Sequence, residues 1–234
     1  MIKQLTWDTR FFGRKIACLT SIPPGDDLVR EIDRARRRGV RYVCCRVILD
    51  DLSTMRRLLR QGFYITSIVA VFEQSINHRG GIVSPQVRAA TPKDIPLLRD
   101  LARGLFPHSR FYHDPFFSHA EADRFYQQWI ENAMDKRDSA IFIVGRGGFI
   151  VCEKKGKCGS IPLVGVTPAM QRRSIGHALM EAALGWFSKK RVEKVTVKTQ
   201  VSNIRAMNYY IREGFQVKYT DATMGCILDR KGDP

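Results

Sequence analysis

The stretch from residue 163 to residue 215 constrains the fold more than any other part of the chain. Strand and helix signals alternate in it with short connections, which predicts an α/β fold on a mixed sheet. The stretch reads as an apolar strand at 163–166, a polar turn at 167–176, a helix from about 178 to 187, a strand at 194–197 and a helix that starts near Asn203 and ends before Gly214-Phe215.

The polar turn at 167–176 has the character of an anion site. Backbone N–H groups at the start of a helix lack partners within the helix and bind anions readily. The strand before the turn can hold a second part of the same ligand. This arrangement suits a long molecule with a pyrophosphate in its middle and a reactive group at one end. Coenzyme A thioesters have that structure.

Two spaced motifs in this stretch resemble the cofactor-binding half of the GNAT superfamily of acyl-CoA N-acyltransferases. The first family motif is Gln/Arg-x-x-Gly-x-Gly/Ala, and Gln171, Ser174 and Gly176 occupy its fixed positions. The second is Asn-x-x-Ala-x-x-x-Tyr-x-x-x-Gly-Phe, which runs here from Asn203 to Phe215. The sequence departs from the pattern at Ser174, where the family has glycine. The resemblance implies a GNAT fold that takes acetyl-CoA as acyl donor.

The same resemblance implies roles for individual residues. Tyr210 stands at the tyrosine that protonates the leaving thiolate, a transfer that is uphill by only about 2 kcal/mol at reference pKa values. Backbone N–H groups near the end of the strand would stabilise the oxyanion if Gly165 or a bulge opens the ladder there. The implied cofactor-binding residues are Leu163, Val164, Gly165, Val166, Gln171, Arg172, Arg173, Ser174, Ile175, Gly176, His177, Ala178, Asn203 and Tyr209.

Several of these positions have a second interpretation. Tyr210 or Tyr209 could be a packing aromatic, and Arg172 and Arg173 could be solvated. His177 could be a surface histidine in the first turn of its helix, and Asn203 could cap its own helix. The sequence identifies no general base: Glu153 is a candidate, a solvated hairpin carboxylate is the alternative, and a sugar amine can lose its proton through water.

A second resemblance covers nearly the whole chain. The pattern Leu5-x-Trp7-Asp8-x-x-Phe11-Phe12-Gly13 is similar to the start of TDP-fucosamine acetyltransferases and their relatives, which acylate the amine of a nucleotide-linked 4-amino-4,6-dideoxy sugar. This group implies cell-surface polysaccharide biosynthesis. The similarity continues in a loop that it implies binds the acceptor, made of His108, Ser109, Arg110, Phe111 and Asp114. Arg110 could hold the nucleotide diphosphate as a bidentate donor. The alternative is an ordered surface loop with a buried Phe111.

Composition agrees with an enzyme that binds anionic small molecules. The net charge is +16 and the pI about 9.9 over 234 residues, which favours anionic ligands or nucleic acid. No zinc spacing or aromatic stacking signature supports nucleic acid. The rival functions are a GNAT enzyme for another amine, such as a protein N-terminus or a polyamine, and a non-catalytic protein that binds coenzyme A or RNA.

The remaining composition predicts a cytoplasmic protein. No apolar run reaches the roughly 18 residues of a membrane span, and the first residues lack a secretory signal. The six cysteines show neither metal-like nor redox-like spacing, so we expect no metal and interpret the cysteines as buried thiols in a reducing cytosol. A homodimer is compatible with these features.

The chain reads as two halves that could be copies of each other. We expect a truncated GNAT-like domain at 1–75, a polar linker at 76–86 and the catalytic domain at 87–234. Residues 51–63 match residues 203–215 at an offset of 152, with Leu58 in place of Tyr210. Coincidence is the alternative, because a helix followed by Gly-Phe is common packing. In the first half we expect a strand near 5–7, a strand near 16–20, a helix at 26–38, a strand at 42–48, a helix near 53–61 and a strand at 64–72.

Overall fold

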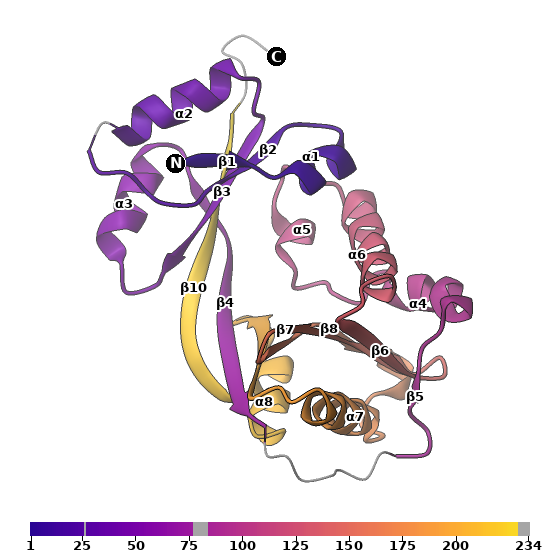
Figure 1. Cartoon of the computed structure of the whole chain (residues 1–234). Helices are drawn as coiled ribbons and strands as arrows, with labels where there is room; N and C mark the ends of the chain where they lie inside the picture. The colour runs from indigo at the N-terminus through magenta and orange to yellow at the C-terminus, as the bar shows by residue number, and fades with distance from the viewer. Residues whose placement is uncertain (26, 77–83, 229–234) are drawn as a thin grey trace. The chain divides into compact units, whose positions relative to one another are not determined.

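Helices and strands alternate along most of the chain in the computed structural model, which describes residues 1–25, 27–76 and 84–228 (Figure 1). The elements of the first half are β1 (Ile2–Gln4), α1 (Thr6–Phe12), β2 (Ile16–Leu19), α2 (Asp27–Arg37), β3 (Tyr42–Ile48), α3 (Leu52–Arg60) and β4 (Tyr64–Ser75). The second half holds β5 (Arg88–Ala89), η1 (Pro92–Asp94), α4 (Ile95–Ala102), α5 (Arg110–His113), α6 (His119–Met134), β6 (Ser139–Val144), β7 (Gly148–Lys155), β8 (Cys158–Val166), η2 (Pro168–Met170), α7 (Ile175–Lys189), β9 (Lys194–Gln200), α8 (Ile204–Arg212) and β10 (Gln216–Ile227). This is the mixed α/β fold that the sequence predicts.

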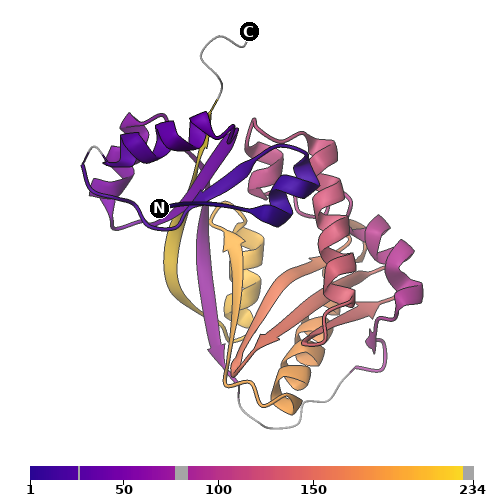
Figure 2. The ribbon, with the colours of Figure 1, turned by 45° about the horizontal axis from the view of Figure 1, so that its top comes forward.

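The first compact unit comprises the described residues of 1–69, 110–121 and 220–234. Its strands lie in the order β1-β2-β3-β10-β4, with β2 and β3 parallel and β3 and β10 antiparallel. Helices α2 and α3 cover one face, where Leu28, Ile32 and Leu58 pack against Val43 and Cys45. Figures 1 and 2 both show α1 and α5 on the opposite side of β3. Because side chains alternate along a strand, that second face receives Tyr42, Cys44 and Arg46.

The second compact unit comprises the described residues of 70–109 and 122–219. Its strands lie in the order β4-β9-β8-β7-β6-β5, and β8 runs parallel to β9 and antiparallel to β7. Helices α7 and α8 pack on one face through Leu179, Phe187 and Tyr210, which join Val195 and Val197 in one core. On the other face, Leu105 after α4 lies so close to Gly165 that a Cβ there would fall 2.2 Å from its side chain. Glycine at 165 therefore permits this packing.

Four consecutive elements of the two halves correspond in position along the chain. β3, α3 and β4 become β9, α8 and β10 when 152 is added to each of their bounds (194 − 42 for the first strand). Helix α2 ends at Arg37 and α7 at Lys189, which differ by the same number. Each short helix is capped alike: the Asp51 carboxylate accepts from the Thr54 N–H at 3.0 Å, and the Asn203 amide oxygen accepts from the Ala206 N–H at 3.2 Å.

Two expectations differ from the structure. The segment near Leu5–Trp7, expected as a strand, forms helix α1, because Trp7 and Phe11 lie one turn apart and stack with ring centroids 5.1 Å apart. Gly13 ends this helix in the left-handed conformation at φ 65°. No strand is predicted after Phe215, where the structure has the twelve-residue strand β10.

The predicted division of the chain at 76–86 stays a prediction. Residues 77–83 of that linker lie outside the described residues. The compact units interleave along the chain, since residues 110–121 and most of β10 group with the first half. All six cysteines are free, and four of them, Cys44, Cys45, Cys152 and Cys226, are buried as expected. Burial was wrongly expected for the other two, since Cys18 is partly exposed and Cys158 is exposed.

Candidate active site

One edge of strand β8 is paired with a neighbouring strand along only part of its length. It pairs with β7 up to Val166, but its register with β9 runs only from Cys158 to Ile161. The register with β7 shifts between Val151 and Glu153, so a bulge in β8 falls between its partners Leu163 and Ser160. From the bulge onward, the β8 edge that faces away from β7 continues without a strand partner among the described residues.

The hydrogen-bond pattern shows which backbone groups occupy that edge. The Thr167 N–H donates to the Gly147 carbonyl at 2.9 Å, which makes these two residues a hydrogen-bonded pair. Pairs alternate in an antiparallel ladder, so the N–H and C=O groups of Val164 and Val166 point away from β7. The Val166 carbonyl accepts from the Gln171 side-chain amide at 3.2 Å, in agreement with this direction. The bulge expected near 164–166 therefore lies slightly earlier, and the edge it opens includes Val164.

The turn between β8 and α7 takes a conformation that its sequence does not favour. Arg172 and Ser174 have φ values of 61° and 57°, in the left-handed region. Ser174 thus adopts, at the family's glycine position, the backbone conformation that glycine adopts at little cost. No side-chain hydrogen bond caps the helix at Ser174, and the first turn of α7 holds no acidic residue. The α7 start therefore presents backbone N–H donors suited to an anion.

Three contacts connect this turn and the start of α7 to helix α8 and the residue that follows it. The Tyr209 hydroxyl donates to the Gly176 carbonyl at 2.7 Å, and its ring lies 3.2 Å from where a Cβ on Gly176 would be. The Arg205 guanidinium donates to the side-chain oxygen of Gln171. These contacts give Tyr209 and Gln171 structural partners within the protein. Their roles in holding the cofactor stay predictions.

The third contact is an ion pair between His177 and Glu213. His177 Nδ1 lies 3.0 Å from Glu213 Oε2, with the histidine side chain 63% exposed and the carboxylate 9%. The hydrogen bond to Glu213 raises the pKa of His177, against a smaller opposing effect of burial. The surface-histidine interpretation of His177 fits this geometry, with the addition of an acidic partner.

Tyr210 lies on the buried side of α8. Its side chain is 5% exposed, and its ring centroid lies 5.6 Å from that of Phe72 and 6.1 Å from that of Phe215. Burial raises the pKa of its phenol. The phenol therefore stays protonated at ordinary pH, which a proton donor requires.

The five residues of the predicted acceptor loop have different surroundings. Ser109 is buried and accepts from the Tyr126 hydroxyl within the second unit. In the first unit, the Asp114 carboxylate is 2% exposed and accepts from the hydroxyls of Tyr64, at 2.8 Å, and Tyr42.

Phe111 is also buried, with ring centroids 6.0 Å from Phe12 and 5.0 Å from Phe117. Ser109, Phe111 and Asp114 therefore fit the alternative of an ordered loop, in which buried side chains have partners within the protein. His108 is exposed. Arg110 lies 4.4 Å over the Phe111 ring, and its Nη1 atom is buried with no hydrogen-bond partner among the described residues.

The Glu153 carboxylate accepts a hydrogen bond from the Lys136 ammonium at 2.7 Å. This pairing fits the alternative of a solvated hairpin carboxylate better than a general base. In the described ranges no group of three or more His, Cys, Asp or Glu side chains could hold a metal ion. Nor does any helix in these ranges have the length and apolar character needed to cross a membrane.

The sequence motifs did not point to Arg205 and Glu213, which connect α8 and the residue after it to the turn before α7 and to the start of α7. Neither lies at a fixed position of the motifs, and both resemble ordinary solvated charges on a short helix. Only the packing of α8 beside α7 shows their partners.

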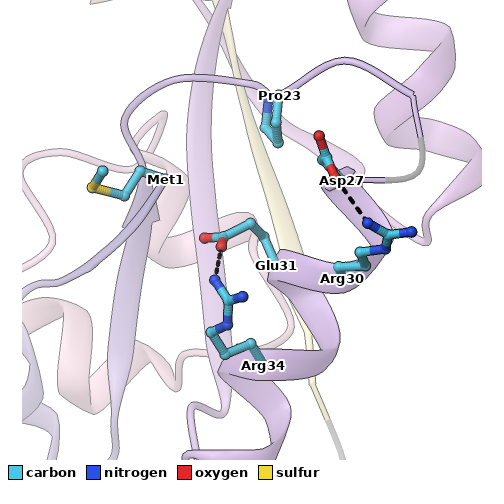
Figure 3. A pocket seen from close by; sticks show the side chains of 6 residues that line it. All are labelled: Met1, Pro23, Asp27, Arg30, Glu31 and Arg34. Atoms are coloured by element: carbon cyan, nitrogen blue, oxygen red, sulfur yellow. Dashed lines mark hydrogen bonds and ion pairs between the residues drawn. The ribbon is translucent and has the colours of Figure 1, made fainter.

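A pocket lies in the first unit, beside the start of α2 (Figure 3). It has a volume of about 350 Å³ and is lined by Met1, Pro23, Asp27, Arg30, Glu31 and Arg34. Both arginines are paired: Arg34 with Glu31, and Arg30 with Asp27 at 3.5 Å. The two carboxylates at this helix start oppose phosphate binding.

Comparison with known proteins gives consistent relatives. Residues 96–215 match the acetyltransferase (GNAT) family. The chain is 28% identical to dTDP-fucosamine acetyltransferase of Escherichia coli O6:H1 over 94% of this chain and 95% of that protein. It is 27% identical to spore coat polysaccharide biosynthesis protein SpsD of Bacillus subtilis over 53% of this chain and 44% of that protein.

A solved GCN5-related N-acetyltransferase from Sphaerobacter thermophilus has the same fold. The TM-score is 0.66 at 15% identity, and the match covers 98% of this chain and 76% of that one. The family match spans the open edge of β8, the turn before α7 and helix α8, which are the parts of the candidate site. The chain therefore belongs to the acetyltransferase (GNAT) family, as an acyl-CoA-dependent N-acetyltransferase.

Proposed function

We propose that the protein transfers the acetyl group of acetyl-CoA to the amine of a nucleotide-linked amino-deoxy sugar of the TDP-4-amino-4,6-dideoxyhexose type. The observation that carries this proposal is the similarity to a dTDP-fucosamine acetyltransferase over 94% of the chain. The similarity to SpsD supports a role in polysaccharide biosynthesis.

The residues around the turn fit a coenzyme A thioester. The uncapped start of α7 offers N–H groups to the pyrophosphate from Arg172 to His177, whereas the Ala178 N–H already donates to the Ser174 carbonyl at 2.9 Å. The exposed Arg172 and Arg173 side chains add positive charge. The open edge of β8 offers the Val164 N–H and C=O to the pantetheine amides. The Asn203 side chain caps its own helix through its oxygen, so the amide nitrogen is the group we assign to the pantetheine arm.

Tyr210 is the residue that we assign to protonation of the thiolate. Attack of the amine on the thioester carbonyl gives a tetrahedral oxyanion, which backbone donors on β8 would stabilise. Its collapse expels a thiolate. Since burial raises the pKa of Tyr210, proton transfer costs more than the roughly 2 kcal/mol expected from reference values. The phenol therefore acts first as a hydrogen-bond donor to the developing thiolate, and the proton follows as charge accumulates on sulfur.

Arg110 is the residue of the acceptor loop that we assign to the nucleotide diphosphate. A buried guanidinium nitrogen without a partner is costly, and an anionic oxygen would satisfy it. Ring stacking on Phe111 holds the guanidinium in place. His108 could contact the sugar or the base. We assign no general base, because Glu153 is paired with Lys136 and a sugar amine can lose its proton to water.

The test is thiol release from acetyl-CoA with TDP-4-amino-4,6-dideoxyhexoses, against N-terminal peptides and polyamines as alternative acceptors. We expect release to saturate with the amino sugar and to stay at background with the other amines. Turnover with a peptide or polyamine instead would assign another acceptor. Binding of acetyl-CoA without turnover on any amine would indicate a non-catalytic protein.

We also propose that the first half is a truncated copy of the GNAT domain, bounded at 1–75. The equal offset of β3, α3 and β4 from β9, α8 and β10 supports this proposal.

The substrates are those of cytoplasmic metabolism, so we place the reaction in the cytoplasm. A homodimer stays a prediction, which size-exclusion chromatography with light scattering would test.

A further inference from the structure

Two cysteines lie side by side in the first unit, on the face of the sheet opposite α2 and α3. Cys18 on β2 and Cys44 on β3 are direct partners in the parallel register. Neighbouring strands lie about 4.8 Å apart, and disulfides form at Cα separations of about 4.4–6.8 Å. Cys18 is partly exposed, whereas Cys44 is 7% exposed. One thiol of the pair is thus accessible to solvent and the other lies beneath the surface.

Two arginines lie near this pair. Arg46 follows Cys44 by two residues on β3 and therefore shares its face, where it is exposed. The segment that contains Arg110 covers the same face, since Tyr42 packs on Phe116 with ring centroids 4.5 Å apart. Asp8 on α1 is the nearby acidic residue.

These surroundings make the two thiols unequal. A hydrogen bond from Cys44 lowers the pKa of the Cys18 thiol, and Arg46 and Arg110 lower it further, against opposing effects of burial and Cys45. For Cys44, the hydrogen bond to Cys18 and burial both raise the pKa, and Asp8 adds to the increase. In the reduced pair, Cys18 is therefore the nucleophile, and Cys44 stays protonated while it donates its hydrogen bond to the Cys18 thiolate.

We propose that Cys18 and Cys44 form a reactive dithiol, which low-molecular-weight disulfides modify at Cys18 and which then closes to a Cys18–Cys44 disulfide. The Cys18 thiolate attacks one sulfur of the small disulfide, forms a mixed disulfide and expels one small thiolate. Cys44 loses its proton and attacks the Cys18 sulfur, which releases the second small thiol. Two protein thiols are oxidised and one small disulfide is reduced to two thiols. This chemistry does not depend on acetyl transfer.

The other four cysteines provide comparisons within the same chain. Burial raises the pKa of Cys45 to about 12 and of Cys226 to about 11, and it raises that of Cys152 as well. Cys158 is more exposed than Cys18 but has no cysteine or arginine among its register partners on β7 and β9, Lys155 and Lys194. Accessibility alone therefore favours modification of Cys158, and the dithiol favours Cys18.

The first experiment uses the reduced wild-type protein with less than one equivalent of iodoacetamide at pH 7, followed by peptide mass spectrometry. We expect Cys18 to be alkylated roughly tenfold faster than Cys158, because the thiolate is the reacting form. Faster labelling of Cys158 would overturn the proposal. No variant is needed, so failure of a mutant to fold cannot obscure the result.

The second experiment adds glutathione disulfide to the wild type and to Cys18→Ser, Cys44→Ser and Cys158→Ser, each checked for native circular dichroism. The wild type and Cys158→Ser should give one linked peptide pair that contains Cys18 and Cys44. Cys44→Ser should retain glutathione on Cys18, and Cys18→Ser should give no Cys18–Cys44 linkage and no glutathione at Cys44. Stable glutathione on Cys18 of the wild type, without closure, would refute the role of Cys44.

Discussion

The two halves of the chain share a framework of helices and strands. They differ at the start of the helix that connects two parallel strands, which is α2 in the first half and α7 in the second. Helices α2 and α7 end at corresponding positions, but α7 begins four residues earlier than the offset predicts (27 + 152 is 179, whereas α7 begins at 175). The additional turn is Ile175–Ala178, which opens the predicted pyrophosphate site. In the first half the helix begins instead with Asp27, and Arg30 and Arg34 are occupied by acidic partners.

This difference separates packing from chemistry. Leu58 and Tyr210 occupy corresponding positions and are both buried, at 0% and 5% exposure. Asp51 and Asn203 both cap the helix that follows. Burial at position 210 and capping at position 203 therefore belong to the shared framework. The phenol, the left-handed turn and the extra helical turn are specific to the second half.

The largest expected effect tests the phenol. Tyr210→Phe keeps the ring and removes the proton donor, so turnover should fall roughly 100-fold or more, within the usual range for loss of a general acid. Acetyl-CoA affinity, measured by calorimetry, should change less than twofold. An equal loss of turnover and affinity would assign Tyr210 to packing. Tyr209→Phe is the matched control for the chemical step: its hydroxyl bonds the Gly176 carbonyl, so its loss should affect acetyl-CoA affinity or stability rather than turnover at saturating acetyl-CoA.

The corresponding position in the first half should affect stability instead. Leu58→Ala removes a fully buried side chain, and we expect a loss of about 2–5 kcal/mol in the free energy of unfolding. Urea denaturation followed by circular dichroism measures this change. Turnover per folded molecule should stay within twofold of the wild type. A large fall in turnover at full folding would show that the first half has a catalytic role.

A smaller effect is expected from charge reversal at the turn. Arg173→Glu places an anion beside the start of α7, where the dipole and N–H groups favour phosphate, and should weaken acetyl-CoA binding about tenfold. Arg56→Glu on α3 makes the same change in net charge and should alter the affinity less than twofold.

Asp27→Asn removes the acid at the start of α2 without adding a turn of helix. It should not create a second acetyl-CoA site, and calorimetry showing two sites would contradict this comparison.

The smallest effect concerns the ion pair between His177 and Glu213. Because its folded-state pKa is raised, His177 contributes stability that is fully present below its unfolded pKa of about 6.5 and is lost as pH rises through the folded value. His177→Ala should therefore cost up to about 1 kcal/mol at pH 5.5 and little at pH 9. Thermal unfolding across this range measures the difference. The same loss at both pH values would exclude the ion pair as its source.

Local patterns were sufficient to place most helices and strands. The apolar run 42–48 coincides with β3, and the Gly-Phe pairs after α3 and α8 mark where each helix ends. Prediction failed at Thr6–Phe12, where a dense aromatic cluster resembles a strand. The aromatics form a helix instead, because spacing by four places Trp7 against Phe11.

The candidate site was predictable to a lesser degree. The motif residues fall at the turn and on α8 as expected. Distant packing partners determine which of them have free polar atoms. The Asp114 carboxylate, for example, resembles a ligand-binding group in the sequence, yet two tyrosine hydroxyls from β3 and β4 donate to it.

The sequence by itself determined the family, the order of most elements and the position of Tyr210, the proposed acid, because spacing within one helix or turn is a local property. Only the tertiary structure decided that β8 separates from β9 after Ile161, that Ser174 is held in a left-handed conformation and that Cys18 lies beside Cys44. Each of these depends on pairing between segments far apart in the chain. Such pairing is set by the free energy of the whole packed sheet, and no short stretch of residues encodes it.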